Sequence, residues 1–175
     1  MAGVEFKGIE IHEGQVQPDW IDLNGHVNVA YYVLAFDKAI DNIWIEFGLT
    51  PEHVHTSQSS TFAAECHITY DREIHLDDRF VITSQLLAFD EKRIHTYLRL
   101  YNADKGYLSA TSEWMSLHVD LTRRKVAPWP DKILKGIQSY AERQGGLPWP
   151  RRSCEHIRVP NPLFSAQRQP GGEQS

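Results

Sequence analysis

The spacing of apolar residues between positions 28 and 48 predicts the longest helix of the chain. Apolar side chains recur there at every third or fourth residue, which is the spacing of a helix with one apolar face. They are Val29, Tyr32, Val33, Phe36, Ile40, Ile43, Trp44 and Phe47. Asn28 is a suitable N-cap residue, and Gly48 followed by Pro51 is typical of a helix end. We therefore expect a helix of about 20 residues, roughly 30 Å long, as a central core element.

Alternation of apolar and polar residues predicts a sheet. The expected strands cover residues 8–16, 62–74, 79–89, 93–101 and 108–121, and the last four follow one another through hairpins. A second, shorter helix is expected over residues 131–144, because Gly145 and Gly146 suit its end. Residues 50–61 are polar without a clear period, so they are expected to form a flap, a binding loop or a disordered loop. One sheet covering one long apolar helix is an α+β arrangement.

Length and composition fit one domain of ordinary apolar content. The chain has 175 residues, of which 41% are hydrophobic, and residues 1–150 are expected to form the domain. Residues 151–175 contain several prolines and are expected to form an extended tail, with the last ten or so residues disordered.

Charge and cysteine content exclude several classes of function. The formal net charge of −5 gives no reason to expect a nucleic-acid partner. No apolar run reaches the 18 or so residues of a membrane span, and the N-terminus lacks a signal sequence, so a cytoplasmic location is expected. Cys66 and Cys154 have no metal-binding spacing. We expect two reduced thiols and no metal site.

A polar turn before the long helix is the candidate site. Asp22, Asn24, His26 and Asn28 occupy alternate positions, so an extended backbone sends their side chains to one side. Gly25 allows close backbone approach. The free N–H groups and partial positive charge of a helix N-terminus suit an oxyanion. The alternative is that these residues only fold the turn and cap the helix.

The turn resembles a known catalytic motif. Asp22-Leu-Asn24-Gly-His26-Val-Asn28, followed by Tyr32, resembles D-x-N-x-H-V-N-x-x-x-Y of plant acyl-carrier-protein thioesterases, in which Asp, Asn and His are catalytic. Residues 70–73, YDRE, resemble the Y-R-R-E of that family, which makes Glu73 a further candidate.

Other stretches resemble acyl-CoA thioesterases of the 4-hydroxybenzoyl-CoA type. Residues 70–78 and 118–124 resemble strand motifs of that superfamily, although position 73 is Glu instead of Pro and position 77 is Asp instead of Gly. Residues 91–95, EKRIH, and 117–120, LHVD, are similar to betainyl-CoA thioesterases and to the thioesterase domain of carnitine dehydrogenase fusions. The resemblance covers about residues 16 to 150. It implies a hotdog fold, in which a curved antiparallel sheet wraps around one long central helix.

The resemblance implies hydrolysis of an acyl-CoA thioester, with betainyl-CoA as a possible substrate. Asp22 would be the general base or the nucleophile, Asn24 would hold the water or the carbonyl, and His26 would relay a proton or orient Asp22. The expected oxyanion donors are the backbone N–H groups of Val27, Asn28 and Val29. No cofactor is needed, since CoA is part of the substrate.

Several residues are candidates for substrate binding. Aromatic faces and a nearby carboxylate can hold a quaternary ammonium group. The candidates are Trp20, Tyr31, Tyr32, Glu65, Glu73 and Trp114. A basic run of Arg123, Arg124 and Lys125 could meet the CoA phosphates. Alternatively, Tyr32 packs in the core, Trp20 anchors the turn, Glu65 is exposed, and the basic run is a solvated turn.

Two other functions fit parts of the sequence. A hotdog hydratase uses D-x-N-P-x-H, but His26 comes one residue too early and the Pro is missing. A non-enzymatic acyl-CoA-binding module has no need of a carboxylate at the helix mouth. An unpaired strand edge as long as residues 93–101 or 108–121 would be an aggregation risk in a single chain, so we expect a homodimer or a larger even homo-oligomer. The expected ligand is an acyl-CoA, and neither nucleic acid nor membrane is expected as a partner.

Overall fold

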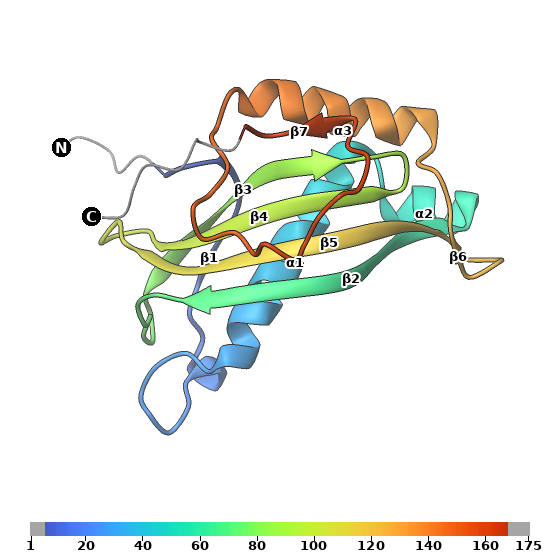
Figure 1. Ribbon diagram of the computed structural model, residues 1–175. Coiled ribbons are helices and arrows are strands. Elements are labelled where there is room, and N and C mark those ends of the chain that lie inside the picture. The colour runs from blue at the N-terminus through green and yellow to red at the C-terminus, as the bar shows by residue number, and fades with distance from the viewer. Residues whose placement is uncertain (1–5, 168–175) are drawn as a thin grey trace. The chain divides into compact units, whose positions relative to one another are not determined.

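The computed structural model describes residues 6–167 of the chain (Figure 1). Its elements in order are β1 (Ile9–Gln15), the 3-10 turn η1 (Pro18–Trp20), α1 (Val29–Phe47), α2 (Pro51–Ser57), β2 (Ser59–Tyr70), β3 (Arg79–Phe89), β4 (Arg93–Asn102), β5 (Leu108–Asp120), β6 (Lys125–Val126), α3 (Asp131–Gln144) and β7 (Phe164–Ser165). Within the described residues these strands form one seven-stranded sheet of order β1-β3-β4-β5-β2, with β6 on β5 and β7 on β3. The predicted α+β class is confirmed.

The strand order corrects one prediction. β2 lies beside β5 instead of forming a hairpin with β3, so β4 and β5 are interior strands. The prediction that residues 93–101 or 108–121 form an exposed edge is therefore wrong. β2 is an outer strand, and residues 62–67 are all exposed on it. Local alternation cannot reveal this order, because it reports which residues are extended and not which strands pair.

The segment 50–61 is also different from its prediction. It contains helix α2, which has Pro51 at its first position. The side-chain oxygen of Thr50 accepts the N–H of His53 at 3.2 Å. A threonine N-cap followed by proline is a helix start signal. This start signal explains why the segment is not a loop.

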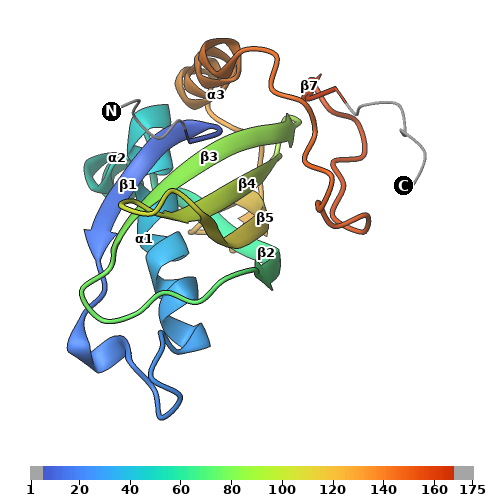
Figure 2. The same ribbon diagram turned by 90° about the vertical axis from the view of Figure 1, so that its left-hand side faces the viewer.

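The described residues fall into two compact units, and β2, β3, β4 and β5 contribute residues to both. The first unit comprises residues 1–46, 67–84 and 98–112, as far as these are described. In it, β1 pairs antiparallel with the first half of β3, from Ile9 opposite Ser84 to Gln15 opposite Arg79 (Figure 2). The buried face of α1 within this unit consists of Tyr32, Ala35, Phe36, Ala39, Ile40 and Ile43. The predicted cap is present, since Asn28 Oδ1 accepts the N–H of Ala30 at 3.0 Å.

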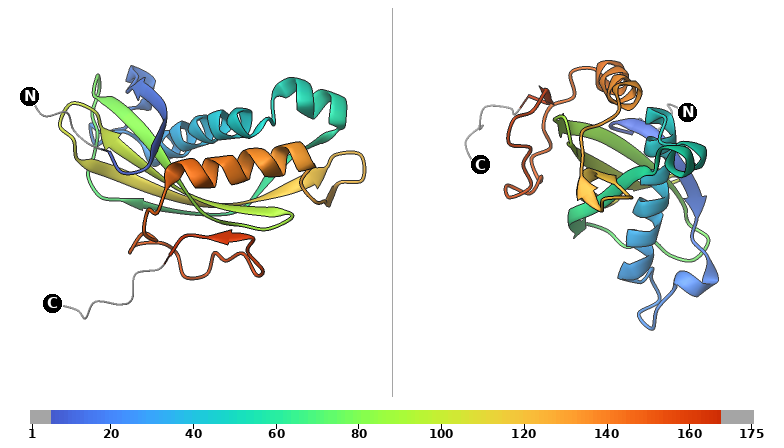
Figure 3. Two further views of the ribbon diagram at one scale, coloured as in Figure 1. Left: turned by 90° about the horizontal axis from the view of Figure 1, so that it is seen from above. Right: turned by 90° about the vertical axis from the view of Figure 1, so that its right-hand side faces the viewer.

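The second unit comprises residues 47–66, 85–97 and 113–175, as far as these are described. Helix α3 contacts the strand residue Leu86 through Gln144, whose carboxamide accepts the Leu86 N–H at 2.7 Å and donates to its carbonyl at 2.8 Å. The C-terminal segment, residues 145–167, contacts both β3 and β5, because Gln85 donates to the carbonyls of Leu147 and Pro148 and Cys154 donates to Glu113. It then returns to β3, where β7 pairs with Ala88 and Phe89 (Figure 3). The predicted boundary at residue 150 stays a prediction, and residues 168–175 lie outside the described part.

A buried polar contact fastens the C-terminal segment to the strands. His95 on β4 and Glu113 on β5 are both almost fully buried, and His95 Nε2 lies 2.6 Å from Glu113 Oε1. The other carboxylate oxygen accepts the backbone N–H of Cys154 at 2.5 Å. Trp149 packs edge-on against the His95 ring, at 5.5 Å between centroids. The Glu113 carboxylate therefore connects β4 and β5 to the C-terminal segment, residues 145–167.

Candidate active site

The residues before α1 form a closed turn. Ile21 and Val27 bridge as in an antiparallel pair, and the N–H of Asp22 donates to the carbonyl of His26 at 3.0 Å. The N–H of Gly25 donates back to the carbonyl of Asp22 at 3.1 Å. Gly25 has a φ of 80°, which a residue with a side chain rarely adopts. The turn therefore has a fixed shape from residue 21 to residue 27.

The structure brings the three predicted catalytic side chains together. Asp22 Oδ1 accepts the backbone N–H of Asn24 at 2.8 Å, and Oδ2 lies 3.5 Å from Asn24 Nδ2. His26 Nδ1 lies 3.8 Å from Asp22 Oδ1 and 3.2 Å from the carbonyl of Val27. The side chains of Asp22 and His26 are 21% and 32% exposed. A water molecule or a substrate can therefore reach the carboxylate without any opening of the core.

The predicted oxyanion donors are mostly engaged within the protein. The N–H of Val27 donates to the carbonyl of Ile74 at 3.0 Å, and the N–H of Asn28 donates to the carbonyl of Trp20 at 2.9 Å. Because both N–H groups already have acceptors within the protein, only the third predicted oxyanion donor, the N–H of Val29, is left as a candidate. Val29 is the exposed first residue of α1, where the helix dipole favours negative charge.

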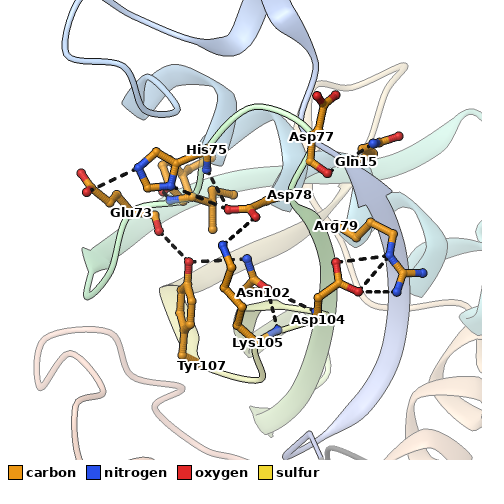
Figure 4. A network of polar contacts seen from close by, with 12 residues as sticks. Gln15, Glu73, His75, Asp77, Asp78, Arg79, Asn102, Asp104, Lys105 and Tyr107 are labelled. Carbon is orange, nitrogen blue, oxygen red and sulfur yellow. Dashed lines mark hydrogen bonds and ion pairs between the residues drawn. The ribbon is translucent and has the colours of Figure 1, made fainter.

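The loop after β2 forms a pocket in the first unit. The pocket has a volume of ≈550 Å³ and is lined by Asp71, Arg72, Glu73, His75, Lys105 and Tyr107. Figure 4 shows the polar contacts around four of them, Glu73, His75, Lys105 and Tyr107. Glu73 is exposed, with Oε1 3.5 Å from His75 Nε2. The Lys105 ammonium lies 2.9 Å from Asp78. Burial disfavours ionisation of Asp78, but the His75 N–H and the Lys105 ammonium outweigh burial and hold the pKa of Asp78 below its usual value.

Of the six residues that line the pocket, the sequence predicts only Glu73 as a site residue. The Arg72 guanidinium lies 4.1 Å from the centroid of the Tyr107 ring, and the Tyr107 hydroxyl donates to the carbonyl of Glu73 at 2.9 Å. Residues 103–107 give only a hairpin signal in the sequence, because nothing local shows that the hairpin meets the loop at residues 71–75. Lys105 and Tyr107 are therefore missed.

The aromatic candidates are distributed over both units. In the first unit, Trp20 stacks on Tyr31 with 5.5 Å between ring centroids and 13° between planes, and also contacts Phe80 at 5.9 Å. Tyr32 is buried, with its hydroxyl hydrogen-bonded inside the protein. Trp114 is buried on β5 in the second unit. The candidate aromatic site near the turn is thus reduced to Trp20 and Tyr31.

The remaining candidates are exposed. Glu65 lies on the exposed stretch of β2. Arg123 and Arg124 lie in the turn after β5, Lys125 begins β6, and all three are exposed. The Arg124 guanidinium lies 5.3 Å from the Phe62 ring. Among residues 6–167, no group of three or more His, Cys, Asp or Glu side chains could hold a metal ion. No helix in this range is long and apolar enough to cross a membrane.

Comparisons with known proteins place the chain in a family. Residues 16–137 match the family described as Thioesterase-like superfamily. A betainyl-CoA thioesterase from Pseudomonas aeruginosa is 36% identical over 149 residues, which are 85% of this chain and 94% of that protein. An L-carnitine dehydrogenase/betainyl-CoA thioesterase from Ruegeria pomeroyi is 36% identical over 81% of this chain, which spans only 28% of that longer protein.

One solved structure extends the comparison to the fold. A protein from Staphylococcus aureus, solved in complex with CoA, has a TM-score of 0.80 and 26% identity, over 89% of this chain and 99% of that one. The predicted hotdog architecture is confirmed by this match. The chain therefore belongs to the thioesterase-like superfamily of acyl-CoA thioester hydrolases, with the hotdog fold.

Proposed function

We propose that this acyl-CoA thioesterase hydrolyses betainyl-CoA, with Asp22 as the catalytic carboxylate. The observation that carries the proposal is the accessible carboxylate of Asp22 just before α1. Two stacked aromatic rings lie on either side of it in the chain: Trp20 just before the turn, and Tyr31 in the first turn of α1. The 36% identity to a betainyl-CoA thioesterase supports the choice of acyl group.

The geometry gives Asp22 a free oxygen for chemistry. Its Oδ1 already accepts the N–H of Asn24, whereas Oδ2 has, among the described residues, only the long 3.5 Å contact to the Asn24 carboxamide. Oδ2 can take a proton from water, or attack the carbonyl carbon itself. In the first case the water oxygen forms the new C–O bond as the C–S bond breaks. In the second case the Asp22 oxygen forms that bond, and a water molecule then hydrolyses the resulting anhydride to release the acid and regenerate the carboxylate. His26 Nδ1 lies 3.8 Å from Asp22 Oδ1, so we assign His26 as the proton donor to the departing thiolate. The N–H of Val29, the first residue of α1, is the donor that we assign to the developing oxyanion.

The chemistry of betainyl-CoA restricts where its cationic head binds. The quaternary nitrogen is separated from the thioester carbonyl by a single methylene group, so it must lie close to the group that attacks the carbonyl. Asp22 therefore supplies negative charge to the head as well as catalysis. The stacked rings of Trp20 and Tyr31 leave no space between them for a trimethylammonium group. The head would instead lie on the outer face of one of these rings.

A neutral analogue tests the proposed acyl group. In 3,3-dimethylbutyryl-CoA a carbon replaces the nitrogen, so shape is kept and charge is lost. Cation–π stabilisation of about 0.5–2 kcal/mol corresponds to roughly 2- to 30-fold in kcat/KM. Each kcat/KM must first be divided by the uncatalysed hydrolysis rate, since the ammonium also activates the thioester.

We expect betainyl-CoA to remain preferred after this correction. The preference should fall in Tyr31→Leu and persist in Tyr70→Leu, which removes an exposed tyrosine of the same unit. Equal corrected values in the unchanged protein would reject betainyl-CoA as the favoured substrate. A panel of acyl-CoA thioesters, followed by thiol release, would then identify the acyl group. Crotonyl-CoA belongs in this panel, because a hydratase would consume it without releasing thiol.

We also propose that two copies of the chain associate through β2. Among the described residues β2 is the last strand in the sheet order and residues 62–67 are exposed on it, so a second strand can pair along its outer edge. Light scattering at micromolar concentration should give twice the chain mass of 20.1 kDa or a larger even multiple. A monomeric mass under these conditions would refute the association.

A further inference from the structure

A buried pair of hydroxyl groups lies between α1 and the loop after β2. Tyr32 is 5% exposed, and its phenolic oxygen accepts the backbone N–H of Ile74 at 3.3 Å. The same oxygen lies 3.5 Å from Oγ of Ser109, a fully buried residue of β5. The Ser109 hydroxyl donates to the carbonyl of Arg72. All of these residues belong to the first unit.

The direction of each hydrogen bond follows from the number of available hydrogens. A serine hydroxyl has one hydrogen, and in Ser109 it is given to the carbonyl of Arg72. Tyr32 must therefore be the donor in its contact with Ser109. The chain runs from the Ile74 N–H through Tyr32 and Ser109 to the Arg72 carbonyl. Burial raises the pKa of Tyr32, so its phenol stays protonated and able to donate.

The loop end of this chain is tied directly to the candidate catalytic turn. Ile74 is 1% exposed and uses both of its backbone groups: the N–H donates to Tyr32, and the carbonyl accepts the N–H of Val27 at 3.0 Å. Val27 stands between His26 and Asn28 in the turn. The loop is held at its other end too, because the carbonyl of Ser109 accepts the N–H of residues 71 and 72 at 2.7 and 3.1 Å.

We propose that Tyr32 and Ser109 are positioning residues, which hold the catalytic turn in place through Ile74 without touching the substrate. This inference rests on the proposed role of Asp22. It assigns a function to Tyr32 other than cation binding. It also gives a function to Ser109, for which the sequence offers no signal.

Kinetics separate positioning from a purely structural role. Tyr32→Phe keeps the ring but removes the acceptor of the Ile74 N–H and the donor to Ser109. A displacement of the order of 1 Å at a catalytic group can cost about 100-fold in rate. We expect kcat to fall by about 10- to 100-fold with KM nearly unchanged. Ser109→Ala should show the same pattern more weakly, and Ser109→Thr, which retains a hydroxyl, should recover most of the rate.

Tyr101→Phe is the matched control. Tyr101 is another buried tyrosine of the first unit, and its hydroxyl bonds the backbone at Lys7 instead of the loop. This change should lower the melting temperature comparably and leave kcat unchanged. The inference is overturned if Tyr32→Phe only lowers the melting temperature, or raises KM at constant kcat.

The remaining outcomes are also informative. If Tyr32→Phe does not fold, Ser109→Ala and Ser109→Thr decide the question by the same split between kcat and KM. An unchanged protein that releases no thiol from any acyl-CoA would refute the proposed function and, with it, the positioning role. An active protein in which both hydroxyl variants keep full kcat would refute the positioning role alone.

Discussion

Loss of the Glu113 carboxylate should destabilise the second unit strongly. Glu113 accepts hydrogen bonds from His95 Nε2 at 2.6 Å and from the Cys154 N–H at 2.5 Å, and both side chains of the pair are nearly inaccessible to solvent. Glu113→Ala leaves two buried donors without an acceptor, at about 1–3 kcal/mol each. Breaking one side of a buried pair costs about 3–5 kcal/mol in total. At about 2–4 °C per kcal/mol for a chain of this size, the melting temperature should fall by roughly 6–20 °C.

Glu113→Gln provides a sharper comparison, because the carboxamide has nearly the same shape. Its oxygen can accept the N–H of Cys154, and its amide can donate to His95 Nε2 once the imidazole hydrogen has moved to Nδ1. His95 Nδ1 is buried without a hydrogen-bond partner in the described residues. The loss should therefore be limited to about 1–3 kcal/mol, the cost of one unsatisfied buried donor.

Thermal unfolding and limited proteolysis measure this effect. In Glu113→Ala the C-terminal segment, residues 145–167, should become cleavable below the melting temperature of the remaining protein, because its contact at Cys154 is lost. A melting temperature within about 2 °C of the unchanged protein, less than about 1 kcal/mol of destabilisation, would refute the assigned role of the pair. Equal destabilisation by Gln and Ala would refute the hydrogen-bond explanation.

Three further predictions concern the fold. Burial lowers the pKa of His118 below its usual value of 6.5. The unfolded chain therefore binds the proton at a higher pH than the folded chain, and stability should fall as the pH drops below about 6.5. His118→Gln should make the melting temperature less dependent on pH between about pH 5 and 7. Gly136→Ala would place a Cβ 2.6 Å from the carbonyl oxygen of Phe47, so it should lower the free energy of unfolding in urea by about 1–3 kcal/mol. At Gly146 an added Cβ would meet no atom within 4 Å beyond its chain neighbours, so Gly146→Ala should leave this free energy nearly unchanged. Asn28→Ala removes the N-cap of α1 and should lower the free energy of unfolding by about 1 kcal/mol, whereas Asn28→Asp should retain most of the cap's stabilising effect.

The parts of the fold that have a strong local signal are predicted well by the sequence. The apolar period and the N-cap Asn28 predict α1 close to its observed bounds. The bounds of β3 and α3 are also predicted closely, from their own local patterns. Helix α2 is missed because its seven residues are too few to show an apolar stripe. Its signal, a threonine followed by proline, is short and common. The place of β2 beside β5 is missed because pairing order depends on contacts across the whole chain.

The candidate site divides in the same way. Asp22, Asn24 and His26 share a short turn, so their proximity follows from a local pattern. The hydrogen bond from the Val27 N–H to the Ile74 carbonyl joins residues far apart in the chain, so the sequence gives no sign of it. Ser109 contacts Tyr32 across 77 positions, and nothing distinguishes it locally from other small residues of β5. Long-range backbone contacts decide which of the predicted donors are available.

The most direct test of the central claim is the hydrolysis rate of Asp22→Asn. An asparagine at this position can still accept the N–H of Asn24 through its side-chain oxygen, so the turn should keep its shape. It cannot act as a base or as a carboxylate nucleophile. With a circular dichroism spectrum and melting temperature like those of the unchanged protein, kcat for acyl-CoA hydrolysis should fall at least about 100-fold. Near-full activity in this folded variant would contradict the assignment of Asp22 as the catalytic carboxylate.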